Sequence, residues 1–107
     1  MKQYNVKITD RALADMEMIY GYIADTLNAP IAAIRQYNRI AKGIESLNSF
    51  PYRCHLFDSE PEHTMGLRQL LVDNYSVIYT INEDIVTVLR VLYSASDISA
   101  CLLGDMD

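Results

Sequence analysis

The sequence is poor in cysteine, in basic residues and in long apolar runs, and each shortage excludes a class of protein. Its two cysteines, Cys54 and Cys101, are too few and too widely spaced for a metal-binding pattern, so we expect thiols that pack inside the protein, with a disulfide as the alternative. No apolar run reaches the roughly 20 residues that a membrane-spanning helix needs, and residues 1–10 lack the apolar core of a signal peptide. We therefore expect a cytoplasmic protein that makes no contact with a membrane.

Positive charge is also scarce. Lys and Arg together number 9 against 14 Asp and Glu, which gives a formal charge of −5. Proteins that bind nucleic acid usually concentrate Lys and Arg on one surface, so this balance disfavours a nucleic-acid partner. A local patch could still form from the arginines, and their placement therefore matters more than their number.

The length and the apolar content suit a single domain. With 107 residues, of which 50% are hydrophobic, the chain can bury one core and offset the conformational entropy that folding removes. We expect one domain over residues 1–107.

The first half of the sequence predicts a strand followed by two helices. Residues 3–8 alternate polar and apolar side chains, as in a half-buried strand, and Thr9 and Asp10 supply oxygens that can cap a helix. Asn28-Ala29-Pro30 ends the first helix and begins the second, and so short a connection predicts an antiparallel hairpin. Apolar residues recur at intervals of three and four on both helices: Leu13, Met16, Tyr20, Ile23 and Leu27, then Ile31, Ile34, Tyr37, Ala41, Ile44 and Leu47.

The second half predicts a loop and three strands. Residues 52–64 lose all periodicity and gather Pro, Asp, Glu and His, which is typical of a surface loop. Three later segments are rich in Val, Ile, Leu and Tyr and are separated by turn residues: 67–72, 75–81 and 85–93. Tight turns between them predict a three-stranded antiparallel meander, and residues 96–103 a short C-terminal helical segment. The fold class is α+β.

Turn length sets which side chains are neighbours on the predicted sheet. If Asp73-Asn74 is a two-residue turn, Arg68 and Tyr79 lie opposite each other on one face. The face of Arg90 is open, because a next turn of two or of three residues moves it from one face to the other. We prefer the register that places Arg90 beside Arg68.

The second half contains four short motifs: Gly66-Leu67-Arg68, Asn74 to Tyr79, Leu89-Arg90-Val91-Leu92, and Asp97. They resemble the ParE-like toxins of the RelE/ParE superfamily, in which a Leu-Arg pair opens one strand and the last strand ends Arg-Val-Leu-His-Gly-x-Arg-Asp. Upstream, Leu47-x-x-Phe50-Pro51 also resembles this family. The resemblance covers nearly the whole chain and implies a strand, a helix hairpin and three strands. It also implies the toxin of a type II toxin-antitoxin module.

The sequence departs from the family at several positions. Tyr93 stands where ParE-like toxins have His, and Ser96 where they often have Arg. RelE-type ribosome-dependent nucleases commonly have Lys or Arg at positions that are neutral here: Leu67, Gln69, Ser76 and Ser94. RNA cleavage needs cations that stabilise the charge on the phosphate, so these departures argue against a RelE-like enzyme.

Five residues are candidates for target binding or another functional role: Arg68, Tyr79, Arg90, Tyr93 and Asp97. Arg90 lies among apolar residues and has to find a partner or reach solvent, so its structural alternative is a salt bridge to Asp97 or Glu83. Arg68 could instead make a cation-π contact with Tyr79. Tyr93 could donate a proton near a phosphate, although a pKa of about 10 makes tyrosine a poor base at neutral pH.

Other residues of chemical interest have simpler explanations. His55 and His63 lie in an acidic loop, but their spacing matches no metal motif, so we expect solvated histidines and neither a metal nor a cofactor. Tyr20, Tyr37 and Tyr75 fit the apolar stripes and are expected in the core.

Three functions follow from the resemblance. The first is a toxin that inhibits a protein target such as DNA gyrase and is neutralised by a cognate antitoxin. The alternatives are a RelE-like endonuclease that acts on mRNA at the ribosome and a toxin-fold protein without activity. The oligomeric state is open, since a homodimer and a hetero-oligomer with the antitoxin both agree with the sequence.

Overall fold

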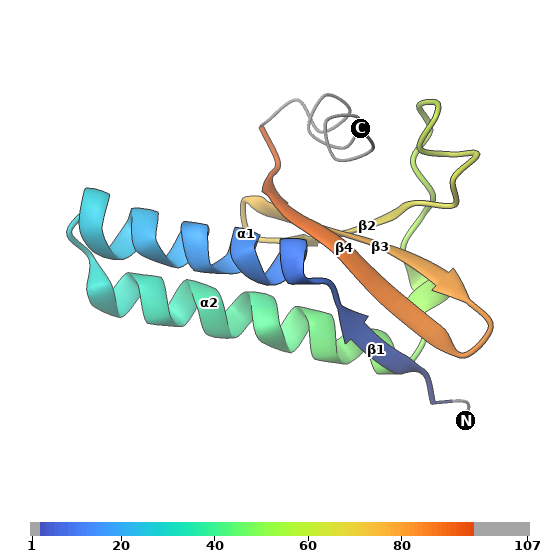
Figure 1. Ribbon diagram of the computed structural model, residues 1–107, viewed down its shortest axis with the longest axis horizontal. Helices are drawn as coiled ribbons and strands as arrows, with labels where there is room; N and C mark the ends of the chain where they lie inside the picture. Colours follow the sequence, from blue (N-terminus) through green and yellow to red (C-terminus); the bar gives the residue numbers. More distant parts are fainter. Residues whose placement is uncertain (1–2, 96–107) are drawn as a thin grey trace.

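The computed structural model describes residues 3–95 (Figure 1). The helical segment expected at residues 96–103, together with Asp97 and Cys101, lies outside the described residues. The elements are β1 (Asn5–Ile8), α1 (Asp10–Gly21), a π-helical turn η1 (Tyr22–Thr26), α2 (Pro30–Glu45), the 3-10 turns η2 (Ser46–Asn48) and η3 (Pro51–Arg53), β2 (Arg68–Val72), β3 (Tyr75–Asn82) and β4 (Ile85–Tyr93).

The strands form one four-stranded sheet in the order β1-β4-β3-β2. The last three strands are the predicted antiparallel meander, and β1 adds to β4 in parallel. Helix α1 packs against β4 and α2 against β2 and β3, which gives the two layers seen in Figure 1. The predicted α+β fold with a helix hairpin is therefore confirmed. Within residues 3–95 no helix is long and apolar enough to span a membrane.

Short-range signals explain where the elements begin and turn. The Thr9 hydroxyl accepts a hydrogen bond from the Ala12 N–H at 3.1 Å, which caps α1 as predicted, and Pro30 occupies the first turn of α2. Asp73 has a positive φ of 55°, the left-handed backbone that a two-residue hairpin turn requires. Arg39 and Gln36 of α2 donate to the Asp73 carboxylate and lower its pKa.

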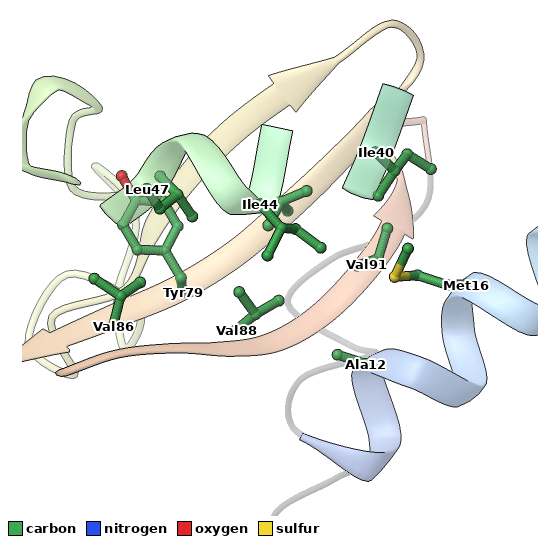
Figure 2. Close-up of a cluster of buried hydrophobic side chains, with 10 residues drawn as sticks. Ala12, Met16, Ile40, Ile44, Leu47, Tyr79, Val86, Val88 and Val91 are labelled. Atoms are coloured by element: carbon green, nitrogen blue, oxygen red, sulfur yellow. The ribbon is translucent and has the colours of Figure 1, made fainter. Parts of the chain in front are cut away.

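The core lies between the helix layer and the sheet. Figure 2 shows side chains that meet there, from both helices, from η2 and from β3 and β4: Ala12, Met16, Ile40, Ile44, Leu47, Tyr79, Val86, Val88 and Val91. The free thiol of Cys54 packs partly buried against this cluster, as expected of a packing residue.

The prediction that the apolar stripes of both helices face the core was only partly correct. Ile31 is 67% exposed and Ile34 is 50% exposed, and Leu13, Tyr20 and Leu27 are exposed as well. Leu13 lies near the start of α1, but the other four belong to the end of the hairpin that continues beyond the sheet in Figure 1, where no second layer covers them. Of the three tyrosines expected in the core, Tyr37 and Tyr75 pack against it.

The packing makes a direct prediction about η2. Leu47 is completely buried whereas its neighbour Glu45 is exposed. Leu47→Ala should lose about 2–5 kcal/mol of unfolding free energy, because truncation removes buried apolar surface and leaves a cavity. Glu45→Ala should stay within about 0.5 kcal/mol of the parent. Urea denaturation of both variants tests this, and equal midpoints would contradict the assigned core.

Candidate functional site

The end of β4 carries two of the five candidate residues, and a β-bulge sets their positions. Arg68 pairs with Tyr79 as predicted, and the β3-β4 turn has two residues. The register then shifts between Ile78 and Tyr79, so Arg90 lies opposite Ile78. The expected placement of Arg90 beside Arg68 is therefore wrong, because an extra residue in one strand reverses the alternation beyond it.

Arg90 is held by Asp15 of α1. Its Nε donates to Asp15 Oδ2 at 2.7 Å and its Nη2 to Asp15 Oδ1 at 3.0 Å. The Asp15 carboxylate also accepts the Val91 N–H at 3.0 Å. Both side chains are buried, at 7% and 8% exposure. The expected structural partners of Arg90 were Asp97 or Glu83; Asp15 was missed, although an acid between Ala12 and Met16 on the buried face of α1 was a usable signal.

Helix α1 also completes the hydrogen bonding of β4 where β1 stops. The β1-β4 ladder ends at the pair Ile8 and Val88. The Thr9 N–H then donates to Val88 O at 3.1 Å, and the Thr9 hydroxyl donates to Leu89 O at 3.1 Å. Further along β4, the Asp15 carboxylate accepts a hydrogen bond from the Val91 N–H. Backbone groups on this edge of β4 therefore bond to Thr9 and Asp15 instead of to a neighbouring strand.

A groove of about 440 Å³ runs between α1 and the end of β4. Its lining includes Arg11, Met18 and Tyr93, with the Asp15-Arg90 pair beneath. Tyr93 is 50% exposed, and its ring meets that of Tyr75 edge-on at 5.9 Å between centroids. Burial raises the pKa of the Tyr75 hydroxyl, and the nearby Tyr93 and Tyr22 raise it further. Among the candidate residues within 3–95, Tyr93 alone is classed as exposed, so a partner can reach it.

Arg68 and Tyr79 hold the loop after the helices. Arg68 Nη1 donates to Cys54 O at 2.6 Å, and its guanidinium lies 4.9 Å from the centre of the Tyr52 ring. The expected cation-π contact between Arg68 and Tyr79 is therefore wrong. Tyr79 is fully buried, and its hydroxyl donates to Pro51 O at 2.6 Å. Burial, together with the neighbouring Cys54 side chain, raises the pKa of that hydroxyl. In residues 3–95 both side chains thus have structural contacts.

The remaining positions singled out by the sequence form no catalytic cluster. Ser76 is buried and hydrogen-bonded to Ser94 at 2.9 Å between hydroxyl oxygens, and Leu67 is buried. His63 Nδ1 lies 2.8 Å from Phe57 O. No group of three or more His, Cys, Asp or Glu side chains within the described range could hold a metal ion.

The buried ion pair gives a stability prediction. Arg90→Ala should cost about 3–5 kcal/mol, and Asp15→Ala a similar amount, because each leaves an uncompensated buried charge. Replacing both, Asp15→Leu with Arg90→Met, should cost clearly less than the sum of the two single changes. Arg39→Ala is the matched control, since its pair with Asp73 is exposed and should matter far less. Additive losses, measured by denaturant unfolding, would show that the pair does not act as a unit.

Comparison with known proteins agrees with this architecture. Residues 6–98 match the family model described as the ParE toxin of the type II toxin-antitoxin system parDE. No curated protein matches the chain by sequence.

Solved structures share the fold at low identity. A chromosomal ParDE system from P. aeruginosa has a TM-score of 0.72 at 22% identity, covering 87% of this chain and 98% of that one. A RelBE toxin-antitoxin complex from Mycobacterium tuberculosis has a TM-score of 0.61 at 19% identity over 85% and 98%. An archaeal RelE-RelB complex from Pyrococcus horikoshii has a TM-score of 0.58 at 17% identity over 89% and 98%. Because the family model matches residues 6–98 of its 107 residues, this chain belongs to the ParE toxin family of type II toxin-antitoxin systems.

Proposed function

We propose that this type II toxin inhibits a protein target, for which the family suggests DNA gyrase, and that it does so without cleaving RNA. The observation that carries the proposal is the state of the positions where RNA-cleaving relatives have cations. Leu67 and Ser76 are buried, and Ser76 is hydrogen-bonded to Ser94. All four positions, which include Gln69 and the exposed Ser94, hold neutral side chains, and these cannot stabilise the charge that develops on a phosphate during cleavage.

The arginines add a second argument, because Arg39, Arg53, Arg68 and Arg90 have polar partners within the protein. Arg39 is paired with Asp73, and Arg53 donates to the Ser49 and Phe50 carbonyls in the turn after α2. Arg68 donates to Cys54 O, and Arg90 is paired with Asp15. A phosphate ligand would have to displace these contacts. With a formal charge of −5, the protein also lacks the long-range attraction that draws nucleic acids to their binding proteins.

A protein target requires less positive charge and more contact area. We propose that the target contacts Tyr93 and Asp97, and that Arg90 fixes the position of the strand that carries Tyr93. Exposed aromatic side chains at the rim of a groove are typical anchors of protein interfaces. Tyr93 has this position, beside the groove between α1 and β4.

The proposal predicts the effect of Tyr93→Ala. The folded variant should inhibit gyrase supercoiling and growth about 30-fold less well, the equivalent of roughly 2 kcal/mol for losing an aromatic anchor. Phe50→Ala is the matched control, because Phe50 is also an exposed aromatic residue but belongs to the turn after α2. Ribosome-bound mRNA incubated with the parent should remain intact. Defined mRNA cleavage would establish the endonuclease alternative, and a parent without any toxicity would establish the inactive one.

We further propose that a cognate antitoxin binds this toxin, as in the complexes of its structural relatives. Met18 at 72% and Tyr22 at 54% exposure provide apolar surface on the hairpin. Met18 also lines the groove that holds Tyr93, so a chain bound there would cover the proposed target contact.

The antitoxin proposal predicts co-purification. A tagged toxin co-expressed with the small protein encoded beside its gene should elute with it, and co-expression should restore growth. Met18→Asp should weaken the complex, because a charge replaces apolar contact area. If the neighbouring protein neither elutes with the toxin nor relieves growth arrest, the pairing is wrong.

A further inference from the structure

The spacing of the buried residues on β4 is irregular. Val88 and Val91 both point into the main core (Figure 2), although they lie three residues apart. Side chains of a regular strand alternate between two faces, so an odd spacing would place these two valines on opposite faces. The β-bulge resolves the conflict, because the pairing with β3 passes from Val88 to Arg90 and leaves Leu89 as the extra residue.

The bulge decides which face of the sheet carries Tyr93. With the bulge, Tyr93 pairs with Tyr75, which packs on the helix side of the sheet. Without it the pairing would move by one residue, so Tyr93 would lie opposite Asn74 and point to the other face. Arg90 would at the same time enter the main core opposite Val77. The bulge therefore places the proposed target contact beside the groove of α1.

Thr9 supplies the hydrogen bonds that the bulge needs. A bulged residue loses its place in the ladder, so its backbone groups require other partners. The Leu89 carbonyl accepts a hydrogen bond from the Thr9 hydroxyl at 3.1 Å, and the Val88 carbonyl accepts one from the Thr9 N–H at 3.1 Å. The same hydroxyl oxygen accepts the Ala12 N–H at 3.1 Å, which caps α1. One side chain thus joins the start of α1 to the bulge of β4.

We propose that Thr9 is a positioning residue of this toxin, whose hydroxyl fixes the bulge and thereby orients Tyr93 toward the protein target. This role rests on the proposed function, in which Tyr93 contacts the target. The β1-β4 ladder ends at Val88, so β1 does not hold the part of β4 that carries Tyr93. Asp15 bonds to β4 just after the bulged residue, through the Val91 N–H, and Thr9 bonds at the bulged residue itself. Helix α1 therefore fixes the bulge from both sides.

The two bonds of the Thr9 hydroxyl can be separated by substitution. A hydroxyl both donates and accepts, whereas an ionised carboxylate only accepts. Aspartate at this position can therefore cap α1 but cannot donate to the Leu89 carbonyl, and valine can do neither. Serine keeps both bonds.

Inhibition of gyrase supercoiling by these variants tests the proposal. Thr9→Asp should keep the helix content of the parent in circular dichroism but inhibit about tenfold less well, because the Leu89 carbonyl loses its donor. Thr9→Ser should inhibit as well as the parent. Thr9→Val, which removes the donor without adding a charge, should lose as much inhibition as Thr9→Asp. Thr87→Val is the matched control, since it removes a hydroxyl from the same strand before the bulge and should inhibit like the parent.

A double variant separates positioning from a general loss of stability. If Thr9 acts through Tyr93, Thr9→Asp should add almost nothing to the loss caused by Tyr93→Ala, because the aromatic anchor is already absent. Losses that add in the double variant would overturn the positioning role. A Thr9→Ser variant as weak as Thr9→Asp would overturn it too.

The geometry can also be measured without any target. In the parent, NMR cross-peaks should connect the rings of Tyr75 and Tyr93, which lie 5.9 Å apart between centroids. Thr9→Asp should weaken these cross-peaks and speed amide hydrogen exchange in residues 91–94 about tenfold, while residues 85–88 before the bulge keep the parent's rates. Unchanged cross-peaks and exchange rates in Thr9→Asp would overturn the proposal even if inhibition falls. A parent that does not inhibit gyrase would overturn the proposed function alone, and the NMR comparison would still decide whether Thr9 fixes the bulge.

Discussion

The carboxylate of Asp15 is the contact on which the arrangement of α1 and β4 depends. It neutralises Arg90 and at the same time accepts a backbone N–H from Val91, beyond the reach of the short strand β1. Neither charge could remain buried alone, because desolvation of an unpaired ion costs several kcal/mol. The pair therefore allows a single relative position of helix and strand. The groove beside Tyr93 follows from it, since α1 and β4 are its two walls.

Polar side chains hold irregular backbone elsewhere in the protein as well. The hydroxyl of Tyr79 and the guanidinium of Arg68 each donate to a carbonyl in residues 51–54. Arg53 donates to the carbonyl of Ser46, the C-cap of the second helix. In this chain several arginines thus stabilise loops and helix ends. The same backbone could carry arginines on its open surface and serve another function, since function depends on the site and not on the fold.

The mismatch in length between the hairpin and the sheet shapes the rest of the surface. The sheet buries Ala12 and Met16 near the start of α1, whereas Tyr22 at its far end is exposed. Apolar residues beyond the sheet have no layer to cover them, so they are available to other chains. A second groove lies between the two helices, and it and the groove beside Tyr93 are lined by different residues of α1.

The sequence alone determined the order and type of the elements, because the signals are local. A cap at Thr9, a break at Pro30 and a turn at Asp73-Asn74 act over a few residues, and the turn also set Arg68 opposite Tyr79. The resemblance of a few motifs was enough to indicate the family and to name the five candidate residues.

Only the tertiary structure decided what those residues contact. Arg90 meets Asp15, which lies 75 positions earlier in the chain, and Arg68 meets Tyr52 because a loop folds back over β2. A bulge of one residue moved Arg90 away from Arg68, and no turn signal marks it. Periodicity showed that Ile31 and Ile34 share a helix face, but not that the sheet ends before it reaches them. Such contacts depend on how far each element extends and on what lies across from it, and the local sequence pattern predicts neither.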